Sequence, residues 1–414
     1  MTQTLTLLAL LAAAPAAAPA PAAPAASTLP NPVPAVTPAP AAAPAPTPPP
    51  VAVKVQNPLA IARAGQTVAV ALADLRKLAS GLDAAKTVVF DDRRKPVLSQ
   101  LVDADGDDTP DELLFQADLG AKESKTFSVE TGTRPTYKAD DFKAYGRFVR
   151  ERHDDFVWEN DRVAHRMYGP DLEIWKKEPL TSSGIDVWVK RAKRMVVNEW
   201  YMTDDYHRDN GDGADFYSVK TSRGCGGIAV FAGDKPAVSR NFVTSRVLTQ
   251  GPLRVVFELG YAPFEVGAGG AKVTETKRIT LDAGSNFNRM ASTFKVEGAG
   301  SALNVGVGIG KHKGADLKTD KHWMRTWEPL PETNGSLGCA IILPAGAAAT
   351  IRPTDLDTFM VAKASAGAPF VFYMGSDWSK RGGGAADAGA WTKAVQEQVR
   401  EIAAPVKVTL SAKK

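Results

Sequence analysis

The segments that decide the fold class are LRVVFEL at 253–259 and KVTETKRITL at 272–281. In the first segment Val255, Phe257 and Leu259 occupy every second position, and a period of two is typical of a strand with one buried face. Similar segments recur between turns, and the strands predicted from them are 67–72, 87–90, 126–130, 253–259, 272–281, 291–296 and 303–309. The sequence therefore predicts a mostly β fold.

One segment near the C-terminus predicts a clear helix. Residues 391–402 follow Gly382, Gly383 and Gly384, which interrupt any regular element before them. No repeat of about 20 to 50 residues is apparent, which disfavours propellers and solenoids. We therefore expect few helices among many strands.

A change of composition at 131–137, where Gly132 and Pro135 stand, separates two β-rich segments. The second segment is longer and richer in Trp, His and Arg. Alternating strands on both sides of this boundary predict two packed β units. We expect a small β-sandwich at 51–134 and a large β-sandwich domain at 135–410.

The N-terminus indicates export. Residues 1–26 combine an apolar stretch with small-residue cleavage sites of the Ala-x-Ala type, although no charged residue precedes Lys54. Residues 27–50 are rich in Ala and Pro and predict an extended tether. No later segment has the ~20 uninterrupted apolar residues that span a bilayer. We expect a signal peptide, a tether and a periplasmic or secreted protein without a membrane span.

Charge and cysteine content narrow the partners and the redox chemistry. The formal net charge is +4 over 414 residues, and no sustained basic stripe or nucleic-acid motif accompanies it. Nucleic acid is therefore not expected as a partner. Cys225 and Cys339 are the two cysteines, and both a disulfide and two separate thiols remain open.

The sharpest local signal is an acidic run around Gly106 at 103–112. Carboxylates at positions 1, 3, 5 and 9 of this run suit Ca²⁺, and the predicted ligands are Asp103, Asp105, Asp107 and Asp111. The run resembles the calcium loops of integrin-type FG-GAP repeats, but Asp108 stands where those loops have glycine. We expect a structural calcium site, and the alternative is an acidic hairpin turn. No organic cofactor is expected.

A second signal is the polar stretch RHDDFVWENDRVAHRMYGP at 152–170. If it forms one strand, one face carries Glu159, Asp161, Val163 and His165, and the other carries Trp158, Asn160, Arg162, Ala164 and Arg166. Carboxylates and arginines can bind sugar hydroxyls or uronates, and tryptophan can stack on a pyranose ring. The alternative for Glu159 and Arg162 is a salt-bridged lattice between two sheets. The predicted substrate-binding residues of this region are Trp158, Arg162, His165, Arg166, Tyr168 and Trp188.

A third signal is the loop at 206–217, in which Gly211 and Gly213 predict a tight turn. Histidine is the side-chain type of this loop whose unperturbed pKa lies near neutrality, so His207 suits general acid or base catalysis. Asp212 and Asp215 could orient it, or a second cation could bind there. The alternative is an exposed loop histidine. His312 and His322, with basic neighbours, are predicted as a further cationic group that receives a carboxylate.

Four motifs in this order resemble the bacterial domain-of-unknown-function family 4861, over about 51–407. They are WENDRVAHRMYGP at 158–170, GIDVW at 184–188, the loop at 206–217 and LDAGS at 281–285. The resemblance implies an exported protein encoded beside enzymes for uronate-rich polysaccharides. It also implies that the large domain is a galactose-mutarotase-like supersandwich.

Together these features predict a carbohydrate-active enzyme whose partner is an acidic oligosaccharide or polysaccharide. A lyase would use Arg162 or Arg166 to neutralise the uronate and His207 or Tyr217 to remove the C5 proton. A hydrolase would use two carboxylates, and the candidates are Glu159, Asp161 and Asp215. A non-catalytic sugar-binding protein and an aldose-epimerase-like mutarotase are the alternatives. We expect the polar stretch and the histidine loop to meet across one cleft.

Overall fold

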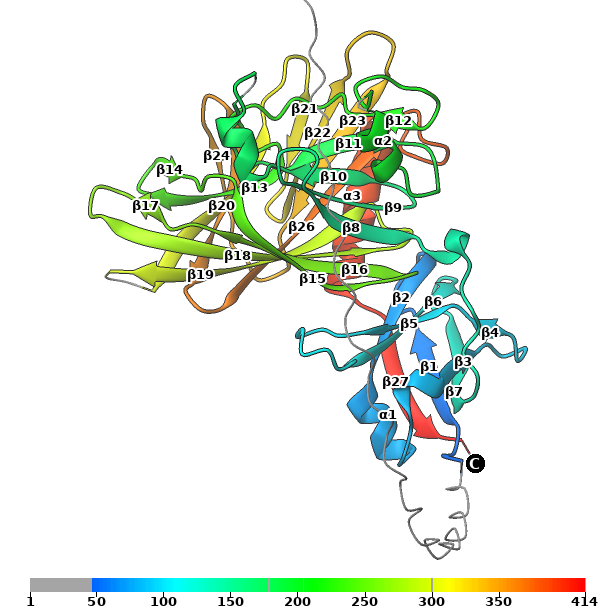
Figure 1. The fold of residues 1–414 in the computed structure, drawn as a ribbon. Coiled ribbons are helices and arrows are strands. Elements are labelled where there is room, and N and C mark those ends of the chain that lie inside the picture. The colour runs from blue at the N-terminus through cyan, green and yellow to red at the C-terminus, as the bar shows by residue number, and fades with distance from the viewer. Residues whose placement is uncertain (1–46, 178, 204, 299–300, 414) are drawn as a thin grey trace, which may run out of the picture. The chain divides into compact units, whose positions relative to one another are not determined.

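The computed structural model describes residues 47–177, 179–203, 205–298 and 301–413. About 48% of the chain is strand and 11% is helix, and the sheets are largely antiparallel (Figure 1). The mostly β fold predicted from the alternating segments is confirmed. The predicted signal peptide and most of the predicted tether lie outside the described residues.

The small domain consists of two sheets that enclose one apolar core. The first sheet has the order β27-β1-β7-β3-β4, and the second has the order β2-β6-β5. The core between them includes Val53, Phe115 and Val129, together with Leu75 of α1. The elements are β1 (Val51–Gln56), β2 (Arg63–Ala71), α1 (Leu72–Leu78), η1 (Ala84–Lys86), β3 (Thr87–Phe90), β4 (Pro96–Val97), β5 (Ser99–Val102), β6 (Glu112–Leu119), β7 (Ser124–Thr131) and β27 (Lys407–Ala412).

The strand β27 brings the C-terminal segment into the small domain. It pairs antiparallel with β1 along its whole length, from Val51 with Ala412 to Gln56 with Lys407. In Figure 1 the red β27 lies beside the blue β1. The expected large domain at 135–410 therefore includes residues that belong to the small sandwich. Pairing between strands so distant in sequence leaves no local pattern that could have indicated it.

One layer of the large domain is a nine-stranded sheet, with the order β15-β16-β18-β19-β26-β23-β22-β21 and β17 on the edge of β18. Its long strands β16 and β18 contain the two segments that predicted the fold class. The bounds are β15 (Phe242–Gln250), β16 (Arg254–Tyr261), β17 (Phe264–Val266), β18 (Ala271–Asp282), β19 (Phe287–Glu297), β21 (Asp316–Thr319), β22 (Trp323–Pro329), β23 (Ser336–Ile342) and β26 (Pro369–Trp378).

The opposite layer consists of two five-stranded sheets. The β12-β11-β10-β9-β8 sheet contains β8 (Ala144–Val149), β9 (Asp155–Asn160), β10 (Ala164–Met167), β11 (Asp186–Lys190) and β12 (Gly213–Ala214). The β14-β13-β20-β25-β24 sheet contains β13 (Cys225–Ala232), β14 (Lys235–Ala237), β20 (Ala302–Gly310), β24 (Thr350–Pro353) and β25 (Asp357–Ser365).

A parallel bridge between Ile185 and Gly224 joins these two sheets edge to edge. A Cβ atom at Gly224 would lie 2.2 Å from the Ile185 carbonyl oxygen, and its φ of +55° also favours glycine. All three sheets contribute to one core, which contains Phe156, Val307 and Phe257. The large domain is therefore a β-supersandwich, as expected.

Four helices outside the small domain complete the described chain. The long helix α3 (Ala388–Ala403) contains the predicted segment, and the Asp387 side chain accepts a hydrogen bond from Ala390 N–H at 2.8 Å at its start. Trp391 stacks on Phe287 with ring centroids 5.7 Å apart, which fixes α3 against the nine-stranded sheet. The remaining elements are η2 (Ala139–Asp141), η3 (Pro170–Ile174) and α2 (Val197–Thr203). Among the described residues no helix is long and apolar enough to cross a membrane.

Candidate functional site

The polar stretch folds as a hairpin rather than as the single strand expected from its alternation. Strands β9 and β10 are antiparallel, with Glu159 opposite Ala164. The Asn160 side chain accepts hydrogen bonds from Arg162 N–H at 2.8 Å and Val163 N–H at 2.9 Å, which turns the chain. Glu159 and His165 consequently lie on opposite faces of the sheet, and the expected grouping of residues by face was wrong.

Four aromatic residues predicted to contact sugar are buried. Trp158 and His165 stack on each other with centroids 5.2 Å apart, and burial lowers the pKa of His165 to about 3. Trp188 stacks on Tyr206 with centroids 5.0 Å apart, and Tyr168 lies beneath a guanidinium. These rings offer no free face to a ligand, so they are core residues rather than sugar contacts.

Glu159, predicted as a catalytic carboxylate, is completely buried and fully bonded. Its carboxylate lies 2.5 Å from Lys190 Nζ and accepts hydrogen bonds from Val196 N–H and Val197 N–H at the start of α2. A buried carboxylate with these partners holds the helix on the sheet. The structural alternative considered for Glu159 therefore describes it better than catalysis does.

Arg166 lies at the centre of a buried cluster of carboxylates at one end of the β8–β12 sheet. Its guanidinium is 2.8 Å from Asp186, 3.5 Å from Asp215 and 3.9 Å from Asp155. Burial raises the pKa of Asp155 to about 7, despite the nearby Arg166. Burial, and after it Asp186, raise the pKa of Asp215 well above its ordinary value. Arg166 is already neutralised and is not available to bind a substrate carboxylate.

The histidine loop meets this cluster from the solvent side. His207 Nδ1 lies 3.6 Å from Asp215 Oδ2, and 66% of its side chain is exposed. The expected meeting of strand and loop therefore occurs through Arg166, Asp215 and His207. Asp215 and Arg166 are buried beneath His207. Catalysis by His207 stays a prediction.

His312 and Tyr217 lie together, away from the histidine loop's His207. His312 is held by Glu328 at 2.8 Å on Nδ1 and by the Ser218 carbonyl at 2.8 Å on Nε2, and the Glu328 hydrogen bond raises its pKa. Tyr217 packs against His312, and its buried hydroxyl has no hydrogen-bond partner among the described residues. His322 is half-buried, and no contact joins it to His312 within the described chain. The predicted cationic group is therefore not assembled.

A large pocket lies at the opposite end of the hairpin, where Arg162 is found. Its volume is about 720 Å³, and its walls are β2, the turn between β18 and β19, the end of β26 and α3. Asn160 donates to the Asp282 and Ser285 carbonyl oxygens at 2.6 and 2.7 Å, and Asp161 accepts from Gly284 N–H at 2.6 Å. Two of the sequence motifs, WENDR and LDAGS, thus build one wall.

Five arginines line this space, which we call the arginine pocket, and they differ in what they contact. The two that are paired with carboxylates are Arg254, bound to Asp282 at 2.5 and 2.9 Å, and Arg381, bound to Asp377 at 2.8 Å. Arg63 is buried and donates to the Ala404 carbonyl at 2.5 Å. The remaining two, Arg162 and Arg289, form no ion pair with any described carboxylate.

Arg162 is half-buried and shares a neutral acceptor with Arg381. Its Nη1 lies 3.1 Å from the Asn286 Oδ1, and the Arg381 Nη2 lies 3.4 Å from the same oxygen. Burial, and next the charge of Arg381, lower the pKa of Arg162. Two guanidinium groups beside one amide oxygen attract an anion. The lattice alternative considered for Arg162 would require a carboxylate partner, which the described residues do not provide.

Several lining residues were not expected from the sequence. Arg289 and Tyr373 are cross-strand neighbours on β19 and β26, and Arg381 follows β26 by a few residues. Their segments carry no motif of their own. The one signal that could have pointed to them is LDAGS at 281–285, because it leads directly into β19.

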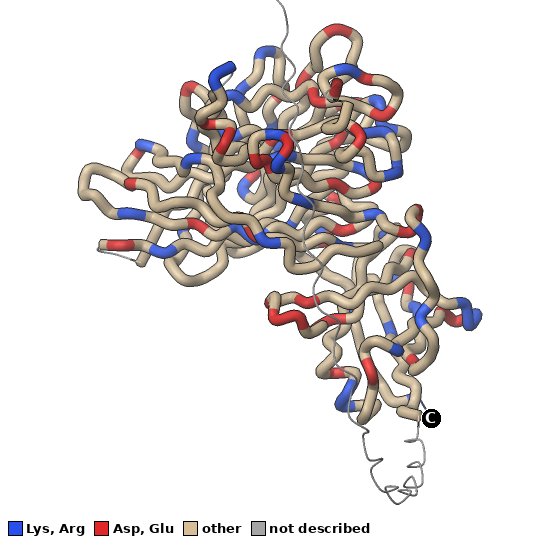
Figure 2. Tube along the Cα trace, in the orientation of Figure 1, with Lys and Arg blue, Asp and Glu red and all other residues tan. Residues whose placement is uncertain are grey.

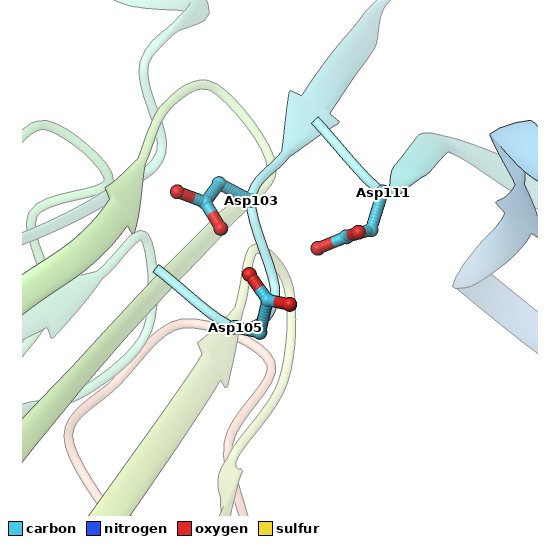
Figure 3. A group of neighbouring side chains, drawn as sticks. All are labelled: Asp103, Asp105 and Asp111. Carbon is cyan, nitrogen blue, oxygen red and sulfur yellow. The ribbon is translucent and has the colours of Figure 1, made fainter. Parts of the chain in front are cut away.

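The predicted calcium loop lies in the small domain between β5 and β6, where Figure 2 shows a run of acidic residues. Carboxylate oxygens of Asp103, Asp105 and Asp111 lie within 4.8 Å of one another and point toward a common space (Figure 3). Asp107, the fourth expected ligand, does not belong to this group and instead accepts from Thr109 N–H at 2.8 Å. Arg278 of the large domain donates to the Ala104 carbonyl at 2.7 Å. Calcium binding at this loop stays a prediction.

The structure has similarity to two solved proteins from Enterococcus faecalis. One, in glycosyl hydrolase family 38, has a TM-score of 0.49 and 10% identity, over 88% of this chain and 48% of that chain. The other, an alpha-mannosidase, has a TM-score of 0.48 and 9% identity, over 88% of this chain and 46% of that chain. This chain spans about half the length of both proteins.

Sequence similarity extends over most of the chain. The Formosa agariphila protein named Uncharacterized protein P7 is 32% identical over 372 residues, which are 86% of this chain and 92% of that protein. The family model described as Domain of unknown function (DUF4861) matches residues 55–408. The match includes all the elements that line the arginine pocket, from β2 to α3. The chain belongs to the DUF4861 family.

Proposed function

We propose that this protein is a carbohydrate-active enzyme that acts on uronate-containing oligosaccharides, and that the arginine pocket binds the uronate carboxylate. The observation that carries this proposal is Arg162. It is a half-buried guanidinium in the wall of this pocket, and it forms no ion pair with a described carboxylate, although the charges of Asp161 and Asp377 also act on it. A charge that is partly removed from water is stabilised by a partner of opposite sign.

The carboxylate of a uronate matches the geometry of two adjacent guanidinium groups. Arg162 and Arg381 both direct an N–H toward the Asn286 Oδ1, so the N–H edges of the two groups approach one point of the wall. Carboxylates accept paired hydrogen bonds from such groups, at about twice the strength of neutral hydrogen bonds. Arg289, exposed on the same wall, supplies a further positive charge.

The remainder of the pocket suits a sugar. A volume of about 720 Å³ accommodates an oligosaccharide segment of a few rings, since small-molecule sites are typically about 300 to 1,000 Å³. The half-buried Tyr373 offers an aromatic ring, and Gln66, Thr67 and Gln398 offer hydrogen-bonding groups for hydroxyls. Polar groups around one aromatic ring are typical of carbohydrate recognition.

We also propose that the protein is exported. The support is the apolar N-terminal stretch with its Ala-x-Ala sites, followed by the Ala/Pro-rich tether. Fractionation of cells that produce the full chain should recover it from the periplasm or the medium. Recovery from the cytoplasm alone, at full molecular mass, would contradict export.

The decisive experiment is incubation of the purified protein with pectin, ulvan and alginate oligosaccharides, beside neutral oligosaccharides of equal length. Binding and turnover confined to the acidic series are the expected results. New ultraviolet absorbance from a carbon–carbon double bond identifies a lyase, and new reducing ends without that absorbance identify a hydrolase. Binding without change would leave a sugar-binding protein, and equal behaviour toward the neutral series would reject the role of the arginine pocket.

A further inference from the structure

Four carboxylates line the arginine pocket, and two of them are fully engaged. Asp282 forms two hydrogen bonds with Arg254, at 2.5 and 2.9 Å. Asp377 accepts from Arg381 at 2.8 Å and from Ala385 N–H and Trp378 N–H at 2.8 and 2.9 Å. Both carboxylates are therefore already paired with an arginine side chain.

The other two carboxylates, Glu397 and Glu401, lie on α3. Glu397 has one weak contact, with Arg400 at 3.9 Å, and Glu401 forms no ion pair with the described residues. Neither side chain makes a hydrogen bond within the described chain. These two groups are therefore the ones available for proton transfer inside the pocket.

The spacing along α3 places both carboxylates on one face. Ala390, Ala394, Glu397 and Glu401 recur at helical intervals and all line the pocket. Residues four apart on a helix have Cβ atoms about 5–6 Å apart. Ala390 and Ala394 have small side chains, which leaves space beside the glutamates. Arg162 and Arg381 line the same pocket. A bound sugar would therefore meet both carboxyl groups from the same side.

The two carboxyl groups have different surroundings. Burial raises the pKa of Glu401, Arg63 on β2 opposes this shift and the charge of Glu397 adds to it. A like charge nearby favours one protonated and one ionised member of a pair. Burial and the charge of Glu397 thus both favour the protonated form of Glu401.

We propose that the arginine pocket carries out β-elimination on a uronate, with Glu397 as the base and Glu401 as the acid. This inference rests on the proposed function and names its reaction. Groups on one helix face can remove a proton and protonate a leaving group on the same side of a sugar ring. Hydrolysis with inversion instead needs its two carboxyl groups on opposite faces of the ring.

The step balances without any co-reactant. Glu397 takes the C5 proton, which is acidic because Arg162 neutralises the adjacent carboxylate. The C5–H electron pair forms the C4–C5 double bond, and the C4–O bond breaks with its electron pair on oxygen. That oxygen receives the proton of Glu401. The products are an unsaturated uronate and a free hydroxyl, and water then exchanges one proton from Glu397 to Glu401.

The test is the isosteric variant Glu401→Gln in the full chain, with Glu397→Gln beside it. Each variant should lose about 10² to 10⁴-fold in kcat on uronate oligosaccharides, while KM changes little. On a uronate with a nitrophenol leaving group at C4, Glu401→Gln should recover most of its rate, because nitrophenolate departs without a proton. Glu397→Gln should not recover. The exposed Glu265→Gln is the matched control and should keep full activity.

The outcomes separate the two proposals. If the wild-type protein binds and changes uronates but Glu401→Gln keeps its kcat, β-elimination by this pair is wrong and the arginine pocket stands. Incorporation of oxygen from labelled water into the product would equally overturn it, because elimination consumes no water. If the wild-type protein neither binds nor changes any uronate, the proposed function itself fails. Circular dichroism of each variant establishes that it is folded.

Discussion

The two ends of the β9–β10 hairpin show how differently two arginines from one motif can be used. Arg166 lies among Asp155, Asp186 and Asp215 and is buried. Arg162, four residues earlier, lines a pocket, and its guanidinium forms its hydrogen bond with the neutral Asn286. The six residues of β9 separate these two ends by about 17 Å, at a rise of ~3.3 Å per residue. Whether an arginine is structural or free to bind a ligand therefore depends on the carboxylates that other strands place beside it.

The strongest test of this comparison is the substitution Arg166→Met against Arg162→Gln. Removal of Arg166 leaves Asp186 and Asp215 buried without their counter-charge, which should lower the free energy of unfolding by about 3–5 kcal/mol. Arg162→Gln should lower it by less than about 1 kcal/mol, because no ion pair is lost. Urea unfolding followed by fluorescence measures both. Equal losses in the two variants would mean that the two ends do not differ as described.

The pKa of Asp155 provides a test of the buried end of the hairpin, where Arg166 lies. Its pKa rises from 3.8 to about 7 on folding, so its contribution to stability is full below pH ~4 and is lost as pH rises through about 7. Between pH 5 and 8 the wild-type free energy of unfolding should therefore fall by on the order of 2–3 kcal/mol relative to Asp155→Asn. Parallel pH profiles for the two proteins would show that Asp155 is ionised throughout.

The end of the hairpin that carries Arg162 is tested by its affinity for a ligand rather than by the stability of the protein. Arg162→Gln should weaken binding of a uronate oligosaccharide by about 10 to 100-fold, since a hydrogen bond to a charged group contributes about 1.5–3 kcal/mol. Isothermal titration calorimetry measures the change. Arg150→Gln, the same substitution at an exposed residue outside the pocket, is the control and should bind as the wild type does. Unchanged affinity in Arg162→Gln would remove this residue from the site.

The aspartate loop is the reverse case, in which carboxylates are gathered without an ion pair to a described side chain, because Arg246 and Arg278 contact only carbonyl oxygens of the loop. Asp103, Asp105 and Asp111 should bind Ca²⁺, and a chelator should then lower the melting temperature. The expected loss is about 1.4 kcal/mol if calcium is initially present at roughly ten times its Kd. Asp105→Asn should abolish the response to chelator. A melting temperature that chelator leaves unchanged in the wild type would exclude the calcium site.

The sequence predicted the elements of the fold better than their partners. The alternation in 253–259 is a local consequence of one buried face, so β16 was expected. The turn at Asn160 was not predicted, because polar residues continue through it. Glu159 and His165 were therefore expected on the same face. Arg381 and Glu401 belong to the pocket only because β26 and α3 approach the LDAGS turn, a long-range arrangement without a local signal.

The pairing of β27 with β1 has a consequence for the order in which this protein can fold during synthesis. The first sheet of the small domain contains residues from both 51–56 and 407–412, so it lacks an edge strand until translation has passed the whole large domain. Leu410 also packs against the small core. The domain made first on the ribosome is therefore completed last, because one edge of β1 stays unpaired until β27 has been synthesised.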